Sequence, residues 1–149
     1  MGKPEAWRLD PGTYSFGMPI GTRFQDLDTM GHINNVAMAA MFETGRVGFH
    51  RHLGRHPQDQ GVRWLIAAVN LSYVREAHFP GDVVIRSGLG HIGNSSWTIL
   101  SAAFQGDDCV ATCDSVMVSQ GPDGRRIISD ETRVLLAPHF VIRPDAALV

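Results

Sequence analysis

The chain has 149 residues, which suits one domain, and we expect it to bury about 70% of its unfolded surface on folding. Its net charge of −2 and pI near 6.4 provide no basic surface for nucleic acid or an anionic membrane. No apolar run approaches the ~20 residues of a membrane-spanning helix, and no signal-like core follows Met1. These features predict a single cytoplasmic domain.

The first third of the chain predicts an irregular lead-in, a strand and one long helix. Residues 1–14 carry prolines, glycines and mixed charge, and a strand is expected over about 15–24. Gly31 supplies a turn, and Asn34 or Asn35 is suited to cap a helix that runs to Leu53 and closes at Gly54. Because residues 36–42 are apolar on nearly every side, we expect this helix to be buried almost all round. Glycines at 45 and 48 weaken it but permit close approach of a neighbour.

The rest of the chain has the period-two pattern typical of strands. After a polar loop around Pro57, strands are expected over about 64–74, 82–91, 94–104 and 108–119, joined by glycine-containing turns. Residues 125–128 are expected to extend the sheet, and the tail from Ala137 to be loose. Cys109 and Cys113 are four residues apart in one strand, about 13 Å, which is too far for a disulfide. The pattern predicts an α+β domain with one helix against an antiparallel sheet.

The segment before the helix carries the chemistry. It places Asp26, Asp28, Gly31 and His32 directly ahead of Asn34 and Asn35. A carboxylate one turn upstream of a helix can face the backbone N–H groups that the helix leaves unpaired. That arrangement places a base or nucleophile beside an oxyanion-binding end, which is what hydrolysis of an activated acyl group requires.

This segment resembles the signature of the 4-hydroxybenzoyl-CoA thioesterase family of hot-dog-fold enzymes, D-x-D-x-x-G-H-(I/V)-N-N. Further echoes occur at 69–73, 80–82 and 93–96, so the resemblance covers roughly 15–136 of a single domain spanning 1–149. It implies an antiparallel β-sheet wrapped around one long central helix. It also implies hydrolysis of acyl-CoA thioesters by a homodimer or homotetramer whose active site lies between subunits. No metal or redox cofactor is implied, and coenzyme A enters only as part of the substrate.

The resemblance also implies residue roles. Asp28 matches the catalytic aspartate, as base or nucleophile, and the N–H of Asn35 matches the oxyanion donor. His32 is expected either to contact the substrate carbonyl, to orient Asp28, or only to hold the turn. Asp26 is expected to be structural, and Glu43 to form an ion pair with a nearby arginine. Substrate contacts are expected along the helix, near the phosphates of coenzyme A and at the Gly-x-Ser-Ser turn. The residues expected to make them are Met38, Met41, Phe42, Arg75, His78, Ser95 and Ser96. The apolar helix residues predict an apolar acyl group.

Alternatives remain open at this point. Residues 78–81 resemble the histidine motif of hot-dog hydroxyacyl thioester dehydratases or hydratases, although a strand rather than the helix follows them here. A non-catalytic acyl-thioester binding protein and an acyl-carrier-protein substrate also remain possible. Residues 88–93 satisfy G-x-G-x-x-G, but no helix follows to hold a pyrophosphate. His50, His52 and His56 are spaced poorly for zinc on one helix face, and no G-x-S-x-G elbow exists.

Overall fold

The computed structural model describes residues 2–54 and 61–144. An antiparallel sheet has the strand order β1-β3-β4-β5-β2, with a short β6 paired to β5. The strands are β1 Phe16–Gly21, β2 Arg63–Tyr73, β3 Asp82–Ile92, β4 Ser96–Gln105, β5 Asp108–Gly121 and β6 Gly124–Arg125. The helices are α1 Asn35–His52 and α2 Asp130–Leu136, with 3-10 turns η1 Ala6–Leu9, η2 Pro11–Thr13, η3 Phe24–Asp26 and η5 Ala137–His139. Helix α1 and the strands β2 to β5 confirm the expected order of elements.

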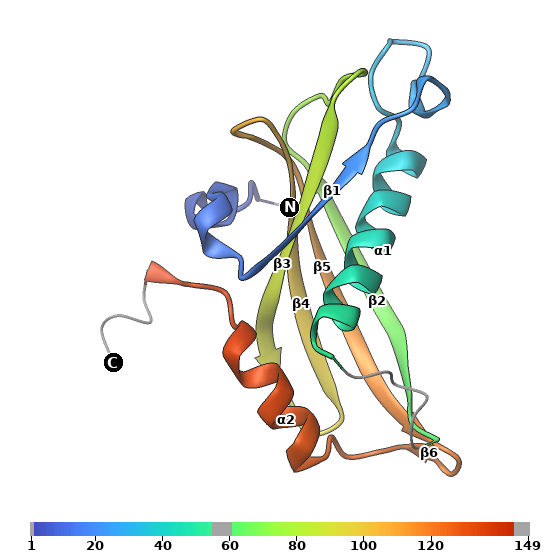
Figure 1. Cartoon of the computed structure of the whole chain (residues 1–149), viewed down its shortest axis with the longest axis vertical. Helices are drawn as coiled ribbons and strands as arrows, with labels where there is room; N and C mark the ends of the chain where they lie inside the picture. Colours follow the sequence, from blue (N-terminus) through green and yellow to red (C-terminus); the bar gives the residue numbers. More distant parts are fainter. Residues whose placement is uncertain (1, 55–60, 145–149) are drawn as a thin grey trace.

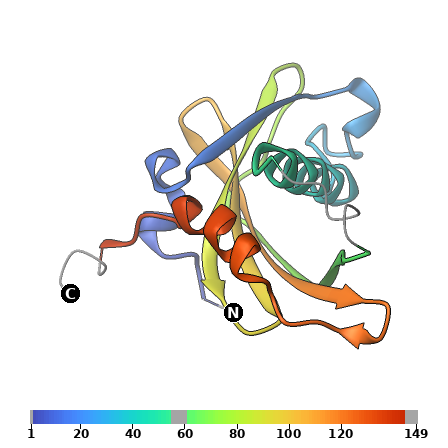
Figure 2. The ribbon, with the colours of Figure 1, turned by 60° about the horizontal axis from the view of Figure 1, so that its bottom comes forward.

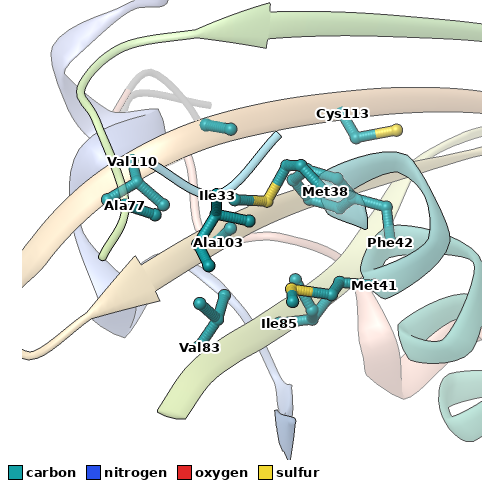
Figure 3. Packing of buried hydrophobic residues seen from close by; sticks show 11 residues of the cluster. Ile33, Met38, Met41, Phe42, Ala77, Val83, Ile85, Ala103, Val110 and Cys113 are labelled. Carbon is teal, nitrogen blue, oxygen red and sulfur yellow. The ribbon is translucent and has the colours of Figure 1, made fainter. Parts of the chain in front are cut away.

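The sheet curves around one side of α1 (Figures 1 and 2). Buried side chains of α1 meet the inner face of the central strands in a continuous apolar cluster (Figure 3). Met38, Met41 and Phe42 lie in this cluster with Val83 and Ile85 of β3. This is the hot-dog architecture, in which one long helix forms the filling of a curled antiparallel sheet, and it confirms the fold class.

In a single copy of the chain α1 is not buried almost all round, so that expectation is wrong. Met38, Phe42 and Phe49 are at most 3% exposed, but Val36 and Val47 on the outer side are 73% and 50% exposed. The helix packs most closely against β3 and β1, so one face meets the sheet and no layer of the described chain covers the opposite face. Its apolar outer residues are therefore left in contact with solvent.

The N-terminal lead-in is ordered, contrary to expectation. Its short 3-10 turns pack on the outer face of the sheet, where Tyr14 and Phe104 make an edge-to-face contact. Arg8 is only 8% exposed; its guanidinium lies 2.8 Å from a carboxylate oxygen of Asp114 and donates to the carbonyl of Ser101. Such turns have no periodic pattern, so the sequence did not reveal them.

The expectation of a loose tail is also wrong for the described part. Ser129 caps α2 by accepting a hydrogen bond from the N–H of Thr132. Leu136, at the end of α2, is fully buried in an apolar cluster of the core. Beyond α2, Phe140 bridges Leu89, and the N–H of Val141 donates to the Leu89 carbonyl at 2.9 Å. This part of the tail is therefore held against β3, just beyond the residues of β3 that pair with β1.

The two cysteines are buried and free, in agreement with the expected small core residues. Burial raises the pKa of Cys109 to about 11, and it also raises the pKa of Cys113. Both thiols stay protonated near neutral pH, so neither supplies a thiolate nucleophile. No helix in the described part of the chain is long and apolar enough to span a membrane.

Candidate functional site

The loop between β1 and α1 is a closed turn built around two acids. The N–H of Asp28 donates to the His32 carbonyl at 2.8 Å, and Gly31 turns the chain with a φ of 78°. Asp26 is buried and accepts from the Arg23 N–H and guanidinium, at 2.9 and 2.8 Å. The hydrogen bond from Arg23 is the main cause that lowers the pKa of Asp26. Asp26 is therefore a structural residue, as expected.

Asp28 is exposed, and one of its carboxylate oxygens is fixed by the turn. That Oδ1 accepts from the N–H groups of Met30 and His32, at 2.9 and 3.1 Å. Within the described chain no hydrogen bond reaches the other oxygen, Oδ2. The turn therefore sets the orientation of the carboxylate while one oxygen remains free for a substrate or a water molecule.

The start of α1 presents unpaired backbone donors. Asn34 is the N-cap, and its side-chain oxygen accepts from the N–H of Ala37 at 2.7 Å. The N–H groups of Asn35 and Val36 lie in the first turn, where a helix offers them no acceptor. The N–H of Asn34 donates to the carbonyl of Asp26, which ties this helix end to the acidic turn. Such an end suits an oxyanion.

An open cleft of about 700 Å³ joins the acidic turn to the helix start. It brings together five of the sequence-predicted residues: Asp28, His32, Asn35, Met38 and Arg75. It is also lined by the end of β2 and the residues after it, from Tyr73 to Ala77, together with Ile33. The carboxylate and the helix N-terminus thus share one cavity, as the sequence predicted.

His32 makes a contact that the sequence did not predict. Its Nε2 lies 3.1 Å from a carboxylate oxygen of Glu76, while only its backbone N–H reaches Asp28. Tyr73 was also missed; its hydroxyl donates to the carbonyl of Asn35 at 3.4 Å. His32 is more than 35 positions from Glu76, and Tyr73 is more than 35 positions from Asn35, so no local pattern could have paired them. The imidazole is therefore oriented by Glu76, not by Asp28.

His78 lies next to the cleft rather than in its lining. Its ring meets the ring of His32 edge-on, with centroids 5.3 Å apart. It lines an adjoining cavity of about 270 Å³ that also contains Arg75 and Glu76. In the described chain no carboxylate lies within ion-pair distance of His78, and α1 precedes it in the sequence. A dehydratase arrangement, with histidine opposite a carboxylate of the helix, is therefore not formed within this chain.

Four predicted substrate contacts lie away from the cleft in one chain. Met41 and Phe42 are 5% and 1% exposed and belong to the core beneath it (Figure 3). Ser95 lies in the β3–β4 turn and Ser96 begins β4, at the opposite end of the sheet from the start of α1 (Figure 1). There, the N–H of Ser119 donates to the Ser95 carbonyl at 2.9 Å. A role for these serines at the cleft requires a second copy of the chain.

Other motifs are resolved by their surroundings. Residues 88–93 form the end of β3 and a turn into β4, so no helix follows the glycines. Glu43 is exposed and, among the described residues, forms no ion pair, so the expected pairing with an arginine is wrong. Of the three histidines weighed as zinc ligands, at 50, 52 and 56, His56 lies outside the described residues. Within the described chain no three potential metal ligands converge.

Comparison with known families agrees with the fold and the cleft. A family model for the thioesterase-like superfamily matches residues 22–136, which include the acidic turn, α1 and all the strands after β1. The chain belongs to the thioesterase-like superfamily. This finding confirms the family-level resemblance that the motif before α1 indicates.

Solved structures give the same result. A predicted thioesterase from Bacillus stearothermophilus is 31% identical, with a TM-score of 0.77, covering 86% of this chain and 98% of that one. A Pseudomonas aeruginosa protein is 27% identical, also with a TM-score of 0.77, over 89% and 96% of the two chains. A Thermus thermophilus thioesterase solved with coenzyme A and zinc is 18% identical, with a TM-score of 0.76 over 85% and 94%, and shares the fold.

Proposed function

We propose that this protein hydrolyses acyl-coenzyme A thioesters to a free acid and coenzyme A. The observation that carries the proposal is the shared cleft, in which the free oxygen of Asp28 and the N-terminus of α1 line one cavity. Membership of the thioesterase-like superfamily supports it, and so does a structural neighbour that binds coenzyme A. An acyl-carrier-protein thioester presents the same reacting group and is the alternative substrate.

The chemistry follows from the two groups that the cleft brings together, the Asp28 carboxylate and the N-terminus of α1. A thioester carbonyl whose oxygen faces the Asn35 N–H is polarised, because the helix N-terminus stabilises negative charge there. Asp28 then either attacks the carbonyl carbon or removes a proton from the attacking water. Direct attack expels the coenzyme A thiolate and leaves a mixed anhydride on Asp28, which a water molecule then hydrolyses, whereas attack by the activated water expels the thiolate and forms the acid directly. Both routes consume one water and release the free acid and coenzyme A. His32, whose Nε2 lies against Glu76, stands beside Asp28; a neutral imidazole that donates from Nε2 to Glu76 can accept a hydrogen bond at its other ring nitrogen.

We also propose that the working form is a homodimer or homotetramer. β2 is an edge strand, and the large apolar side chains Ile66, Val69 and Tyr73 are 46%, 47% and 54% exposed. A free edge with apolar neighbours invites pairing with another strand. Pairing through β2 also covers the side of the cleft formed by Tyr73.

The decisive experiment is hydrolysis of short and medium acyl-CoAs, measured with a thiol-trapping dye. The Asp28→Asn variant is nearly isosteric but replaces the carboxylate by an amide, so we expect kcat to fall at least ~100-fold with little change in KM. Asp107→Asn, in the exposed β4–β5 turn, is the matched control and should behave as wild type. Near-full activity of Asp28→Asn would move the chemistry to another residue. Binding without thiol release in the wild type would instead indicate a non-catalytic binder.

A further inference from the structure

The side of α1 that faces β2 lies beside an exposed part of the inner face of the sheet. Tyr73, Leu71 and Val69 of β2 lie opposite Ala111, Cys113 and Ser115 of β5. Ala111 and Cys113 belong to the core cluster under α1, so this row of β2 faces the helix side of the sheet. Yet Tyr73 and Val69 remain 54% and 47% exposed, because α1 packs mainly over β3 and β1. An exposed strip of the sheet, formed by Val69, Leu71 and Tyr73, therefore lies beside the flank of α1, and at Tyr73 it meets the cleft.

One cation lies next to this strip. Asn35, Ala39 and Arg46 are spaced so that their side chains share one flank of α1, since eleven residues make about three turns. The Arg46 guanidinium lies 3.3 Å from the Ser115 hydroxyl and 3.7 Å from the Cys113 sulfur, and these two residues of β5 pair with Val69 and Leu71 of the strip. Ser115 and Cys113 are fully buried. Arg46 thus reaches down from the helix to the sheet on the same flank as the oxyanion site.

The surroundings of Arg46 provide no negative charge. Burial raises the pKa of Cys113, so its thiol is neutral, and Ser115 is neutral as well. One turn further along α1, burial and the nearby Arg46 charge lower the pKa of His50 to about 4, so this imidazole is also neutral near pH 7. In the described chain no carboxylate lies within ion-pair distance of Arg46. Where a second copy of the chain covers this strip, an anionic partner from elsewhere would stabilise the cation.

We infer that Arg46 binds a carboxylate at the far end of the acyl chain, so that the substrates are ω-carboxyacyl thioesters. This inference rests on the proposed thioester hydrolysis and names its substrate class. It revises the wholly apolar acyl group that the sequence alone predicts, since the stem of the chain lies along Leu71 and Val69 while its end meets a charge.

The structure also sets the length of the acyl chain. The Tyr73 hydroxyl contacts the carbonyl of Asn35, which places Tyr73 level with the start of α1. Cys113 and Ser115 pair with Leu71 and Val69, two and four residues from Tyr73 along β2. That separation is about 7 to 13 Å, the span of roughly six to ten carbons in an extended chain. A shorter dicarboxylic acyl group would not reach Arg46 from the oxyanion site.

The test compares three ω-carboxyacyl-CoAs (adipoyl, suberoyl and sebacoyl) with plain acyl-CoAs of equal length (hexanoyl, octanoyl and decanoyl). We expect the wild type to prefer the charged member of at least one pair in kcat/KM. Arg46→Gln should lower that preference ~10- to 100-fold, as expected for loss of a charge-assisted pair. Arg51→Gln removes the same charge from the exposed side of the same helix and should keep the wild-type preference.

Several results would overturn the inference. One is a wild-type preference for every plain acyl-CoA; another is an equal loss for both members of a pair in Arg46→Gln. Dissociation of the assembly in Arg46→Gln, measured by sedimentation, would instead assign Arg46 to a contact between copies, for example with the exposed Glu43 of a partner. If none of the six thioesters is hydrolysed, the proposed function fails. In that case calorimetry can compare the binding of the charged and plain thioesters of equal length. A preference for the charged member that is lost in Arg46→Gln then still decides the role of Arg46.

Discussion

Two glycines in α1 offer a matched pair of substitutions that tests how the helix is seated. A methyl group added at Gly45 would place its Cβ 2.8 Å from the Cβ of Ile85, and closer still to one of its γ-methyl groups. Ile85 is β-branched and fully buried, so it cannot move aside. At Gly48 the added Cβ would meet the sulfur of Met18, which is the far part of a flexible and only partly buried side chain.

The expected free-energy changes have opposite signs. Alanine in a helix interior is favoured over glycine by about 0.5 to 1 kcal/mol. Overpacking a core typically costs about 1 to 3 kcal/mol, which outweighs that gain at Gly45. We therefore expect Gly45→Ala to destabilise the protein by about 1 to 2 kcal/mol. Gly48→Ala should be neutral or stabilising by up to about 1 kcal/mol, because Met18 can adopt another rotamer.

Urea unfolding at one fixed protein concentration measures both changes, since assembly makes the apparent stability depend on concentration. The slope of the transition should stay constant, so that the midpoints report stability directly. A Gly45→Ala protein at least as stable as the wild type would contradict the close seating of α1 on β3. A strongly destabilised Gly48→Ala protein would show that β1 is as rigid as β3.

Three further predictions concern the pH response, the cleft and the assembly. The pKa of His50 is lowered to about 4, so the unfolded chain takes up a proton at this residue before the folded one does. Its contribution to stability is complete above the unfolded pKa near 6.5 and is lost as the pH falls toward 4; NMR titration and acid unfolding of His50→Phe check this. Glu76→Gln should lower kcat about 3- to 10-fold and move its pH profile, with the fold unchanged in circular dichroism, if Glu76 orients His32. Sedimentation at micromolar concentration should give two or four times 16.3 kDa, and a fully active monomer would contradict the shared-site model.

Much of the fold could be predicted because its signals are local. Alternation of apolar residues marked the long strands, and the asparagines at 34 and 35 marked the start of α1; the bond to Ala37 shows that Asn34 is the cap. The N-terminal turns were missed because their order depends on distant contacts, such as that of Arg8 with Asp114. The seven-residue α2 was missed for a related reason: a short helix held by buried Leu136 has too few turns to show a period.

The candidate site was predictable only where it is continuous in sequence. Asp28, His32 and Asn35 lie within eight positions, so one motif contained them, and the cleft confirms that they lie together. Glu76 and Tyr73 reach the same cleft from β2 and the residues after it, and that register is set by pairing with β5. Arg46 escaped notice because a single arginine in a helix has no distinguishing pattern; only the neutral floor beneath it reveals the missing counter-charge.

Three features of the described residues lack a partner of one kind: the edge of β2 has no second strand, the outer residues Val36 and Val47 have no apolar cover, and Arg46 has no counter-charge. They differ in what can satisfy them. Backbone groups along a strand edge are satisfied by another strand, and exposed valines by an apolar surface, so both suit a second copy of the chain. The charge of a guanidinium above a neutral floor is compensated best by an anion. If the second copy covers the edge and the valines while the exposed strip beside Arg46 stays open to substrate, the assembly itself encloses the acyl chain. Subunit pairing and substrate selection would then depend on neighbouring but separate residues, which is why Arg46→Gln should alter the substrate preference and leave the sedimentation coefficient unchanged.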